Sequence, residues 1–478
     1  MRLKILLLAA GTLAGCTMGP DYHPPEIGLT PGYMSAAGIA AERENASWWS
    51  GFDDPILVDL VARATAGNLD IAQAEARITQ ARAVARAAGA ALLPSVDAAG
   101  SVVSASQSRE TPVGKITQAF GQPRGNTQYA VGAEASWEID LFGGLRRGRE
   151  AARADLGSAE AQAAGVRIAI AAETADAYVA LRGLQARLAV AERQRTIQAQ
   201  LVDLIRQRVD QGLSANRELN RATGALEGVR ASLPPLRAGV AAQLNRIDVL
   251  VGEQPGTNRA LLIAESAVPT APAPEGSGAP TELLRRRPDI VAAERRLAAA
   301  NARIGVSIAD YYPHLSLSGL LGVASLGTGT LFTGNAVQAS GGAGLRWRLF
   351  DFGRVDAEVA QARGAQAEAL AAWRGSVLKA AEDVETALSR LSEAHVERGD
   401  LARQIAALTK ARAQADQAYA GGVVALIEVI DADRELLAAS DRQASVQTEE
   451  ARAAIAAYRA LGGGWHIGDT ALASNPAR

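Results

Sequence analysis

The sequence predicts a mixed α/β membrane protein in which pairs of strands alternate with very long helices, in two similar halves. Residues 339–349 place Leu345, Trp347 and Leu349 on one face and glycines and arginines on the other, a period of two that is typical of a strand. Residues 355–420 contain no proline and are rich in alanine, glutamine and glutamate, so they predict one helix of about 100 Å at ~1.5 Å per residue. A helix of that length does not fit inside a compact domain, which indicates a long hollow or coiled assembly.

The same plan occurs earlier in the chain. Residues 129–141 again alternate apolar and polar side chains, and residues 145–211 again form a long helical pattern. Gly212 reverses the chain after this helix, as Gly421 and Gly422 do after the later one. Further matched pieces are 70–75 with 289–294, Pro94 with Pro313, and Leu141-Phe142 with Leu349-Phe350. We therefore predict an internal two-fold repeat.

Residues 1–15 predict a secretory signal peptide, because a charged start is followed by an apolar run too short to cross a bilayer. The end of this run, Leu13-Ala14-Gly15-Cys16, is similar to a bacterial lipobox, in which Cys16 becomes the lipidated first residue of the mature protein. Cys16 is the only cysteine, so no internal disulfide is possible. Thr17 is not an aspartate, which under the usual bacterial sorting pattern implies the outer membrane. An incidental cysteine after an ordinary signal peptide is the alternative.

The mature chain is predicted to begin with an extended, lipidated segment, 16–55, in which Trp48, Trp49 and Phe52 are aromatic anchors. The first repeat, 56–256, comprises a helix 56–91, strands 94–106 and 129–141 joined by a polar loop 107–128, and a helical hairpin 145–250. Pro234-Pro235 must kink or split the returning helix of this hairpin.

The second half follows a linker, 257–280, that is rich in proline, glycine, serine and threonine. The second repeat, 281–461, comprises a helix 281–310, strands 313–326 and 337–350, and a hairpin of 355–420 with 423–461, before a loop-like tail 462–478. Four strands cannot close into a transmembrane barrel, since bacterial barrels begin at about eight strands with an even count. Two copies give eight strands and three give twelve, so the strand count predicts an oligomer.

Composition narrows the functional class. No segment after the signal is a continuous apolar run of transmembrane-helix length, so a spanning part would have to be strands closed into a barrel. The 49 basic and 51 acidic residues give a net charge of -2, which argues against nucleic acid as a partner. The four histidines have no ligand spacing, and no nucleophile motif or phosphate-binding glycine loop is present. We expect no enzyme activity, no metal site and no cofactor other than the covalent lipid on Cys16.

Separated stretches of the chain resemble one family of bacterial proteins. They are the mature start Cys16-Thr-Met-Gly-Pro-Asp-Tyr-His-Pro-Pro25, Leu283-Leu-Arg-Arg-Arg-Pro-Asp-Ile-Val-Ala-Ala-Glu294 with Tyr311-Tyr-Pro313, and Asn68-Leu-Asp-Ile71 with Leu92-Leu-Pro94. Together they extend over nearly the whole chain. They are similar to the outer-membrane factor (TolC-like) family and most similar to its OprM/NodT lipoprotein branch.

The resemblance implies a homotrimer with a twelve-stranded barrel in the outer membrane of a Gram-negative bacterium, set on a long periplasmic α-helical barrel. Such proteins are the exit duct of tripartite efflux pumps, beside a periplasmic adaptor and an inner-membrane pump of the resistance–nodulation–division or a similar type. They passively export small molecules such as drugs or toxic compounds. A type I-like protein-secretion duct is the alternative within this class, and a non-transport trimeric structural lipoprotein is the alternative outside it.

The resemblance also implies a gate where the long helices converge at their turns. Carried over by position, Ile427 is an apolar ring, Asp431 an acidic ring and Arg434 a tether, and their spacing places them near one helix face. Three aspartates near an axis select cations and repel one another unless they are paired. Glu428 and Asp433 leave open which carboxylate faces the pore. The alternative is an exposed charge pair that contributes little to stability.

Two further groups have a predicted role. Trp137 and Trp347 occupy matching places in the two repeats and are predicted to anchor the strands at the membrane interface, with ordinary sheet packing as the alternative. The run Arg285-Arg-Arg287 precedes Pro288 and is predicted to cap a helix or to pair with acids of a neighbouring helix rather than to form an anion site.

Overall fold

The computed structural model describes residues 17–26, 45–271 and 287–463 of the chain. The predicted signal peptide, Cys16, most of the inter-repeat linker and nearly all of the tail lie outside these residues. The chain divides into two compact units, which are treated separately. Unit one comprises residues up to 25, 79–158 and 294–372, and unit two comprises 26–78, 159–293 and the chain from 373 onward.

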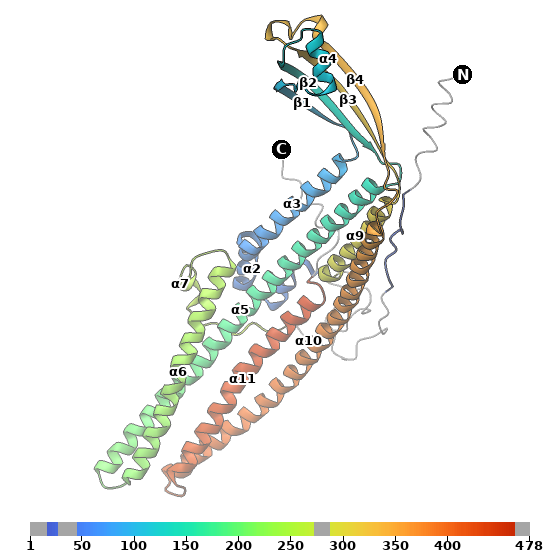
Figure 1. The fold of residues 1–478 in the computed structure, drawn as a ribbon. Coiled ribbons are helices and arrows are strands. Elements are labelled where there is room, and N and C mark those ends of the chain that lie inside the picture. The colour runs from blue at the N-terminus through green and yellow to red at the C-terminus, as the bar shows by residue number, and fades with distance from the viewer. Residues whose placement is uncertain (1–16, 27–44, 272–286, 464–478) are drawn as a thin grey trace. The chain divides into compact units, whose positions relative to one another are not determined.

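Unit one contains a four-stranded antiparallel sheet in the order β1-β2-β3-β4 (Figure 1). The strands are β1 Ser95–Ser106, β2 Gly125–Ile139, β3 His314–Ser325 and β4 Val337–Arg346. The two predicted strand pairs are therefore confirmed, and they are joined through β2 and β3, where Ile139 lies opposite Leu315. Both edge strands, β1 and β4, are exposed along their whole length.

Unit one differs from the prediction in its strand boundaries and in one added helix. Strand β2 runs from Gly125 to Ile139 rather than over 129–141. The last strand ends at Arg346 rather than at residue 350, because the Asp351 carboxylate accepts hydrogen bonds from the backbone N–H groups of Gly353 and Val355 and so starts the next helix. The polar loop 107–128 contains a short helix, α4 Pro112–Ala119. Proline at its first position and the capping hydroxyl of Thr111 account for this helix.

The predicted single helix 56–91 is wrong, because the structure divides it into α2 Pro55–Gly67 and α3 Leu69–Ala90. Asn68 separates the two with an extended backbone. Its side-chain oxygen accepts from the N–H of Asp70 at 2.9 Å, which caps α3, and its buried amide donates to the Leu250 carbonyl at 2.9 Å. The break is thus stabilised by a contact with a distant part of the chain.

Two helical hairpins dominate unit two and lie side by side with their turns at the same end (Figure 1). The first consists of α5 Gly144–Asp210 and α6 Asn216–Leu250, and the second of α10 Arg354–Ala420 and α11 Leu426–Ala460. Of the kink or split predicted at Pro234-Pro235, the split does not occur, because α6 continues through both prolines. Both prolines are exposed. Because proline has no N–H, the carbonyls one turn earlier lose their helical hydrogen-bond donors, and on this exposed face they can bind water instead.

The segment preceding α2 is only partly as predicted. Residues Asn45–Phe52 form a short 3-10 helix, η1, rather than extended chain. Two of the three aromatic anchors are confirmed: Trp48 is buried and stacks on Tyr458 with ring centroids 5.3 Å apart, and Phe52 is buried beside it. Trp49 is half-buried and meets Trp48 edge-on. The remaining helical elements are α7 Arg259–Leu262, α9 Pro288–Ala309, η2 Thr328–Thr330 and η3 Gly334–Ala336. Among the described helices, none combines the length and the apolar character needed to cross a membrane.

Element boundaries recur at two constant shifts in residue number. One constant difference in residue number relates both ends of α3 to those of α9, and both ends of β1 to those of β3. A second constant difference relates α5 to α10 and α6 to α11 in the same way. The second shift aligns Gly143 with Gly353, which both have a left-handed backbone, with φ of 82° and 86°. It therefore matches Phe142 with Phe352. The predicted match of Phe142 with Phe350 is two residues out of register.

Candidate functional site at the hairpin turns

The two hairpin turns have the same geometry. Gly212 and Gly422 both adopt φ of +73°, the left-handed conformation that ends a helix. After each of them the next N–H donates back into the helix, from Leu213 to the Arg208 carbonyl at 2.7 Å and from Val423 to the Ala418 carbonyl at 2.9 Å. The structure therefore places both predicted reversals at a glycine-capped helix end.

Gly421 differs from the other two turn glycines. It has no left-handed backbone, and its N–H continues the helix by donating to the Gln417 carbonyl at 3.0 Å.

We expect Gly212→Ala and Gly422→Ala each to destabilise the folded chain by about 1–2 kcal/mol, because a side chain is strained in the left-handed region. Gly421→Ala is the matched control and is expected to change stability little. Urea unfolding followed by circular dichroism measures the difference, and equal midpoints for all three variants would contradict this account.

The predicted gate residues lie on the first turns of α11. Leu426 and Ile430 are buried, whereas Ile427 is half-buried and Asp431 and Arg434 are exposed on the other side of the helix. Within the described residues, the side chains of Asp431 and Arg434 make no hydrogen bond or ion pair, so the predicted tether does not form inside one chain. The arrangement presents an apolar side chain, a carboxylate and a guanidinium that are all open to a further partner.

Asp433 has a different role from Asp431. Its side chain is 4% exposed, and one carboxylate oxygen accepts from Nε of Arg412 on α10 at 3.0 Å. It follows Leu426, Val429 and Ile430 on the buried face of α11. This ion pair binds the two helices of the second hairpin together, which removes Asp433 from the candidate pore carboxylates and leaves Asp431 and Glu428.

The first and second hairpins are joined near their turns by an apolar cluster and one polar contact. Leu426 and Ile430 of α11 pack with Val202 and Ile205 of α5 and with residues of α6. The Arg208 guanidinium donates to the hydroxyl of Tyr419 at 2.8 Å and lies 5.3 Å from the centre of its ring. These contacts hold the end of α10 and the start of α11 against the first hairpin.

Farther from the turns, α5 and α11 are linked by two bidentate arginine–aspartate pairs. Arg187 donates to both carboxylate oxygens of Asp441 at 2.7 and 3.0 Å, and Arg452 does the same to Asp176 at 2.6 and 3.0 Å. The hydrogen bonds to the aspartate raise the pKa of each arginine, so both stay charged. Sequence reasoning missed these pairs because the two partners lie in different repeats and no local spacing relates them.

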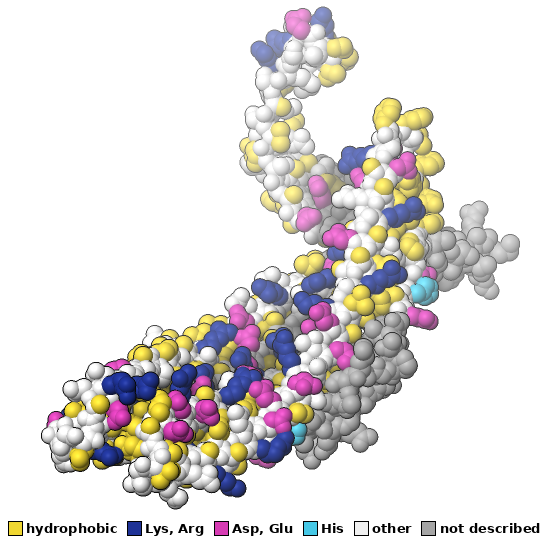
Figure 2. Space-filling view, turned by 90° about the horizontal axis from the view of Figure 1, so that it is seen from below, with side chains coloured by type: hydrophobic (Ala, Val, Ile, Leu, Met, Phe, Trp, Pro, Cys, Tyr) yellow, Lys and Arg dark blue, Asp and Glu magenta, His cyan; other side chains and the backbone are white. Residues whose placement is uncertain are grey.

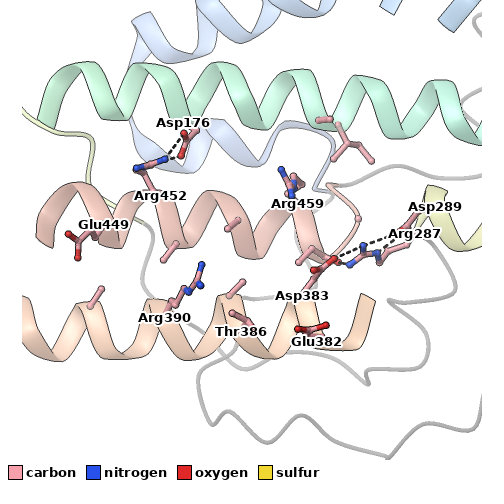
Figure 3. Close-up of a pocket in the computed structure, with 18 of the residues that line it drawn as sticks. Asp176, Arg287, Asp289, Glu382, Asp383, Thr386, Arg390, Glu449, Arg452 and Arg459 are labelled. Atoms are coloured by element: carbon pink, nitrogen blue, oxygen red, sulfur yellow. Dashed lines mark hydrogen bonds and ion pairs between the residues drawn. The ribbon is translucent and has the colours of Figure 1, made fainter. Parts of the chain in front are cut away.

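A cavity of about 960 Å³ lies in unit two, lined by α5, α10, α11, the start of α9 and the residue before it (Figure 3). Arg287 donates to the carboxylates of Asp289 and Asp383 at 2.8 and 3.1 Å and to the Ala460 carbonyl at 2.9 Å. The predicted pairing with acids of a neighbouring helix is confirmed for Arg287, whereas Arg285 and Arg286 lie outside the described residues. Burial lowers the pKa of Arg287, but the two carboxylates outweigh it and raise the pKa overall. The described residues that line the cavity include no serine, cysteine or histidine.

The first described residues lie against α5 and α9 within unit one. Arg147, which is buried, donates to the Met18 carbonyl at 3.1 Å and to the Asp21 carboxylate at 2.7 Å. This hydrogen bond lowers the pKa of Asp21. A Cβ on Gly305 would lie 2.7 Å from the Met18 carbonyl oxygen, so glycine leaves the space that the segment occupies. The chain is therefore fixed two residues after Cys16, which itself lies outside the described residues.

The two predicted anchor tryptophans make the same contact in each repeat. Trp137 donates its indole N–H to the Leu92 carbonyl at 3.0 Å, and Trp347 donates to the Tyr311 carbonyl at 2.9 Å. Both rings are partly exposed. Both indole N–H groups therefore donate hydrogen bonds within unit one. Only the partly exposed rings remain available to contact the surroundings of each tryptophan.

Charges of both signs are distributed over the helical surface. Acidic and basic side chains both occur along the helices on the face shown in Figure 2. Across the described ranges, no group of three or more histidine, cysteine, aspartate or glutamate side chains is placed to hold a metal ion.

Comparison with known proteins gives concordant matches. The sequence profile of the family "Outer membrane efflux protein" matches residues 60–253 and 279–463. The chain is 32% identical to the pyoverdine export outer membrane protein OpmQ of Pseudomonas putida, over 97% of this chain and 96% of that protein. It is 30% identical to the outer membrane protein OprJ of Pseudomonas aeruginosa, over 97% and 96%. The solved structure of the outer-membrane channel OprN superposes with a TM-score of 0.84 at 34% identity, over 94% of this chain and all of that chain.

Proposed function

The chain belongs to the outer membrane efflux protein family, and we propose that it forms, as a homotrimer, the exit duct of a tripartite pump that moves small molecules from the periplasm to the outside. It is an outer-membrane efflux channel of a Gram-negative bacterium. The observation that carries this function is the family match over both halves of the chain, together with the likeness to a solved outer-membrane channel.

The proposed cargo is a small molecule. The relative OpmQ is named for the export of pyoverdine, and this favours small molecules over a secreted protein. We keep a protein-secretion duct as the second candidate. The proposed partners are a periplasmic adaptor and an inner-membrane pump, because an outer-membrane channel alone supplies neither energy nor a path across the inner membrane.

The trimer and the internal duplication are parts of the same proposal. The two constant shifts between element boundaries support a duplicated gene segment. Each copy supplies four strands with two unpaired edges, β1 and β4. Three copies would supply twelve strands in one closed sheet. Trp137 and Trp347 would then present their exposed ring faces at the membrane interface.

The gate is proposed at the start of α11. Ile427, Asp431 and Arg434 have the exposure that a ring around an axis requires, and the two charged residues have no partner among the described residues of their own chain. In a trimer, three copies of Asp431 would face the axis, with Arg434 of each copy close enough to compensate the charge.

We expect Cys16→Ala to abolish incorporation of radiolabelled palmitate and to leave the channel able to assemble, because Arg147 fixes the following residues independently of the lipid. Palmitate labelling followed by electrophoresis without boiling measures both effects. Wild-type protein that takes up no label would contradict the lipoprotein assignment.

The direct test of the duct is single-channel recording from purified protein in a planar bilayer. Small, mostly closed currents are expected from the wild type, because the gate closes in the absence of partners. Properly inserted protein that never conducts would instead favour a structural lipoprotein.

A further inference from the structure

A short amphipathic helix lies at one end of the sheet in unit one. Helix α4 connects the end of β1 to the start of β2, at the opposite end of the sheet from the start of α5 (Figure 1). Its buried side carries Gly114, where a Cβ would overlap the Ser108 carbonyl oxygen, so glycine lets the helix lie directly on the preceding chain. The helix is therefore held in place from one side.

The other side of α4 is apolar and uncovered. Val113 and Ile116 are 55% and 57% exposed, and Phe120, at the end of the helix, is 78% exposed. Spacings of three and four residues place these side chains on one face. The connection between β3 and β4, at the same end of the sheet, adds Leu326 and Phe332, which are 67% and 80% exposed. This end of the sheet thus presents large apolar side chains to its surroundings.

Basic side chains accompany this apolar surface. Arg109 precedes α4, Lys115 lies on α4, and Arg124 lies directly before β2. All three are exposed. Within the part of the chain that the structure describes, their side chains make no hydrogen bond or ion pair. The three cations are therefore open to an anionic partner.

The charge of this end of the sheet argues against a second copy as that partner. Residues 107–128 contain three basic side chains and one acidic side chain, and residues 326–336 contain no charged side chain. A neighbouring copy would therefore bring more positive charge to the same place rather than acids. A surface that is apolar and cationic is complementary to one that is apolar and anionic. A phosphate-bearing lipid surface has both properties, whereas a soluble polyanion lacks the apolar part.

The position of α4 along the strands agrees with a membrane surface. In the proposed duct, Trp137 marks one membrane interface, near the end of β2. Gly125, the first residue of β2, lies about 40 Å farther along the strand at ~3.4 Å per residue, or about 30 Å along the membrane normal at a tilt of about 40°. The hydrocarbon region of a bilayer is ~30 Å thick. Helix α4 would then lie at the opposite, outer interface.

We propose that α4, together with Arg109, Lys115 and Arg124, binds the phosphate-bearing lipid surface of the outer leaflet and anchors the outer end of the sheet. The apolar face of α4 enters the boundary between headgroups and acyl chains, and the three cations bind lipid phosphates. This inference rests on the proposed outer-membrane duct and adds a lipid-binding element to it.

A fluorescent reporter on α4 tests the contact with lipid. Full-length protein with Ile116→Cys is labelled with a nitrobenzoxadiazole dye and reconstituted into phosphatidylcholine vesicles that contain phosphatidic acid. We expect the emission to shift to the blue and to be quenched by lipids that carry a spin label near the headgroup. Gln118→Cys, on the opposite side of the same helix, is the matched control and is expected to show neither effect. Wild-type protein treated with the dye measures the background from Cys16.

Replacement of the cations tests the preference for phosphate. Spin-labelled phosphatidic acid is expected to quench the dye at position 116 several-fold more strongly than spin-labelled phosphatidylcholine. The combined change Arg109→Gln, Lys115→Gln and Arg124→Gln is expected to abolish this difference, because the positive charge that attracts the headgroup is lost. Arg109→Lys with Arg124→Lys keeps the charge and is expected to keep the difference. A difference that survives the loss of all three cations would overturn their assignment to lipid phosphate.

The outcomes separate the lipid contact from the proposed function. A dye that shifts to the blue without being quenched by lipid is covered by protein, which overturns the proposal in favour of a contact between copies. A dye that shows neither effect, in protein that conducts in a planar bilayer, overturns the proposal and leaves the duct standing. Inserted protein that never conducts while its dye is quenched removes the duct and keeps the lipid contact.

Discussion

Asp431→Ala is expected to raise the single-channel conductance of the purified protein and to weaken its preference for cations. The carboxylate is exposed on α11 and has no partner within the described chain, so its function depends on groups brought to it by assembly. In the proposed trimer, loss of one exposed Asp431–Arg434 pair of ~0.5 kcal/mol per copy amounts to ~1.5 kcal/mol over three copies, about a tenfold increase in the ratio of open to closed channels. Removal of the proposed acidic ring would also remove a source of cation selectivity.

Two matched variants locate the effect. Asp433→Asn is expected to leave conductance near the wild-type value and to weaken the second hairpin, because Asp433 is buried against Arg412. Glu428→Ala tests the other exposed carboxylate near the turn. If Glu428→Ala opens the channel and Asp431→Ala does not, the pore carboxylate has been assigned to the wrong residue. Currents and ion selectivity that are the same in all variants would place the gate elsewhere.

The strands and long helices could be predicted because their signals are local and repeated. The period of two in 129–141 and the proline-free runs of both long helices are read directly from neighbouring residues. The break at Asn68 could not be found in this way. An asparagine between helical stretches is ambiguous, and here it is settled by the carbonyl of Leu250, in the returning helix of the first hairpin.

The candidate site shows the same division. The turn glycines and the start of α11 follow from short motifs, and the structure places them where the sequence predicts. The motif alone did not show that Asp431 is exposed and Asp433 is buried. The helical spacing does indicate it, because Asp433 lies on the same face as the buried Leu426 and Ile430. Pairs such as Arg187 with Asp441 cannot be predicted from the sequence of either repeat, because each partner looks like an ordinary surface charge until the two hairpins are packed together.

Arg287→Ala is expected to have the largest effect on stability, a loss of about 2–3 kcal/mol. The side chain is 10% exposed and joins three elements of unit two, through Asp289 at the start of α9, Asp383 of α10 and the Ala460 carbonyl at the end of α11. Breaking a buried ion pair costs about 3–5 kcal/mol. The two carboxylates remain about half exposed and can be rehydrated, which reduces that cost.

Thermal unfolding in detergent, followed by far-UV circular dichroism, measures this change as a fall of several degrees in the apparent Tm. Arg287→Lys is expected to recover only part of it, since an ammonium group cannot span two carboxylates and a carbonyl as the planar guanidinium does. Arg193→Ala, at an exposed arginine of α5, is the control and is expected to leave the Tm unchanged. An Arg287→Ala protein as stable as this control would show that the three contacts contribute nothing net. The junction of α9, α10 and α11 would then be held by its apolar packing alone.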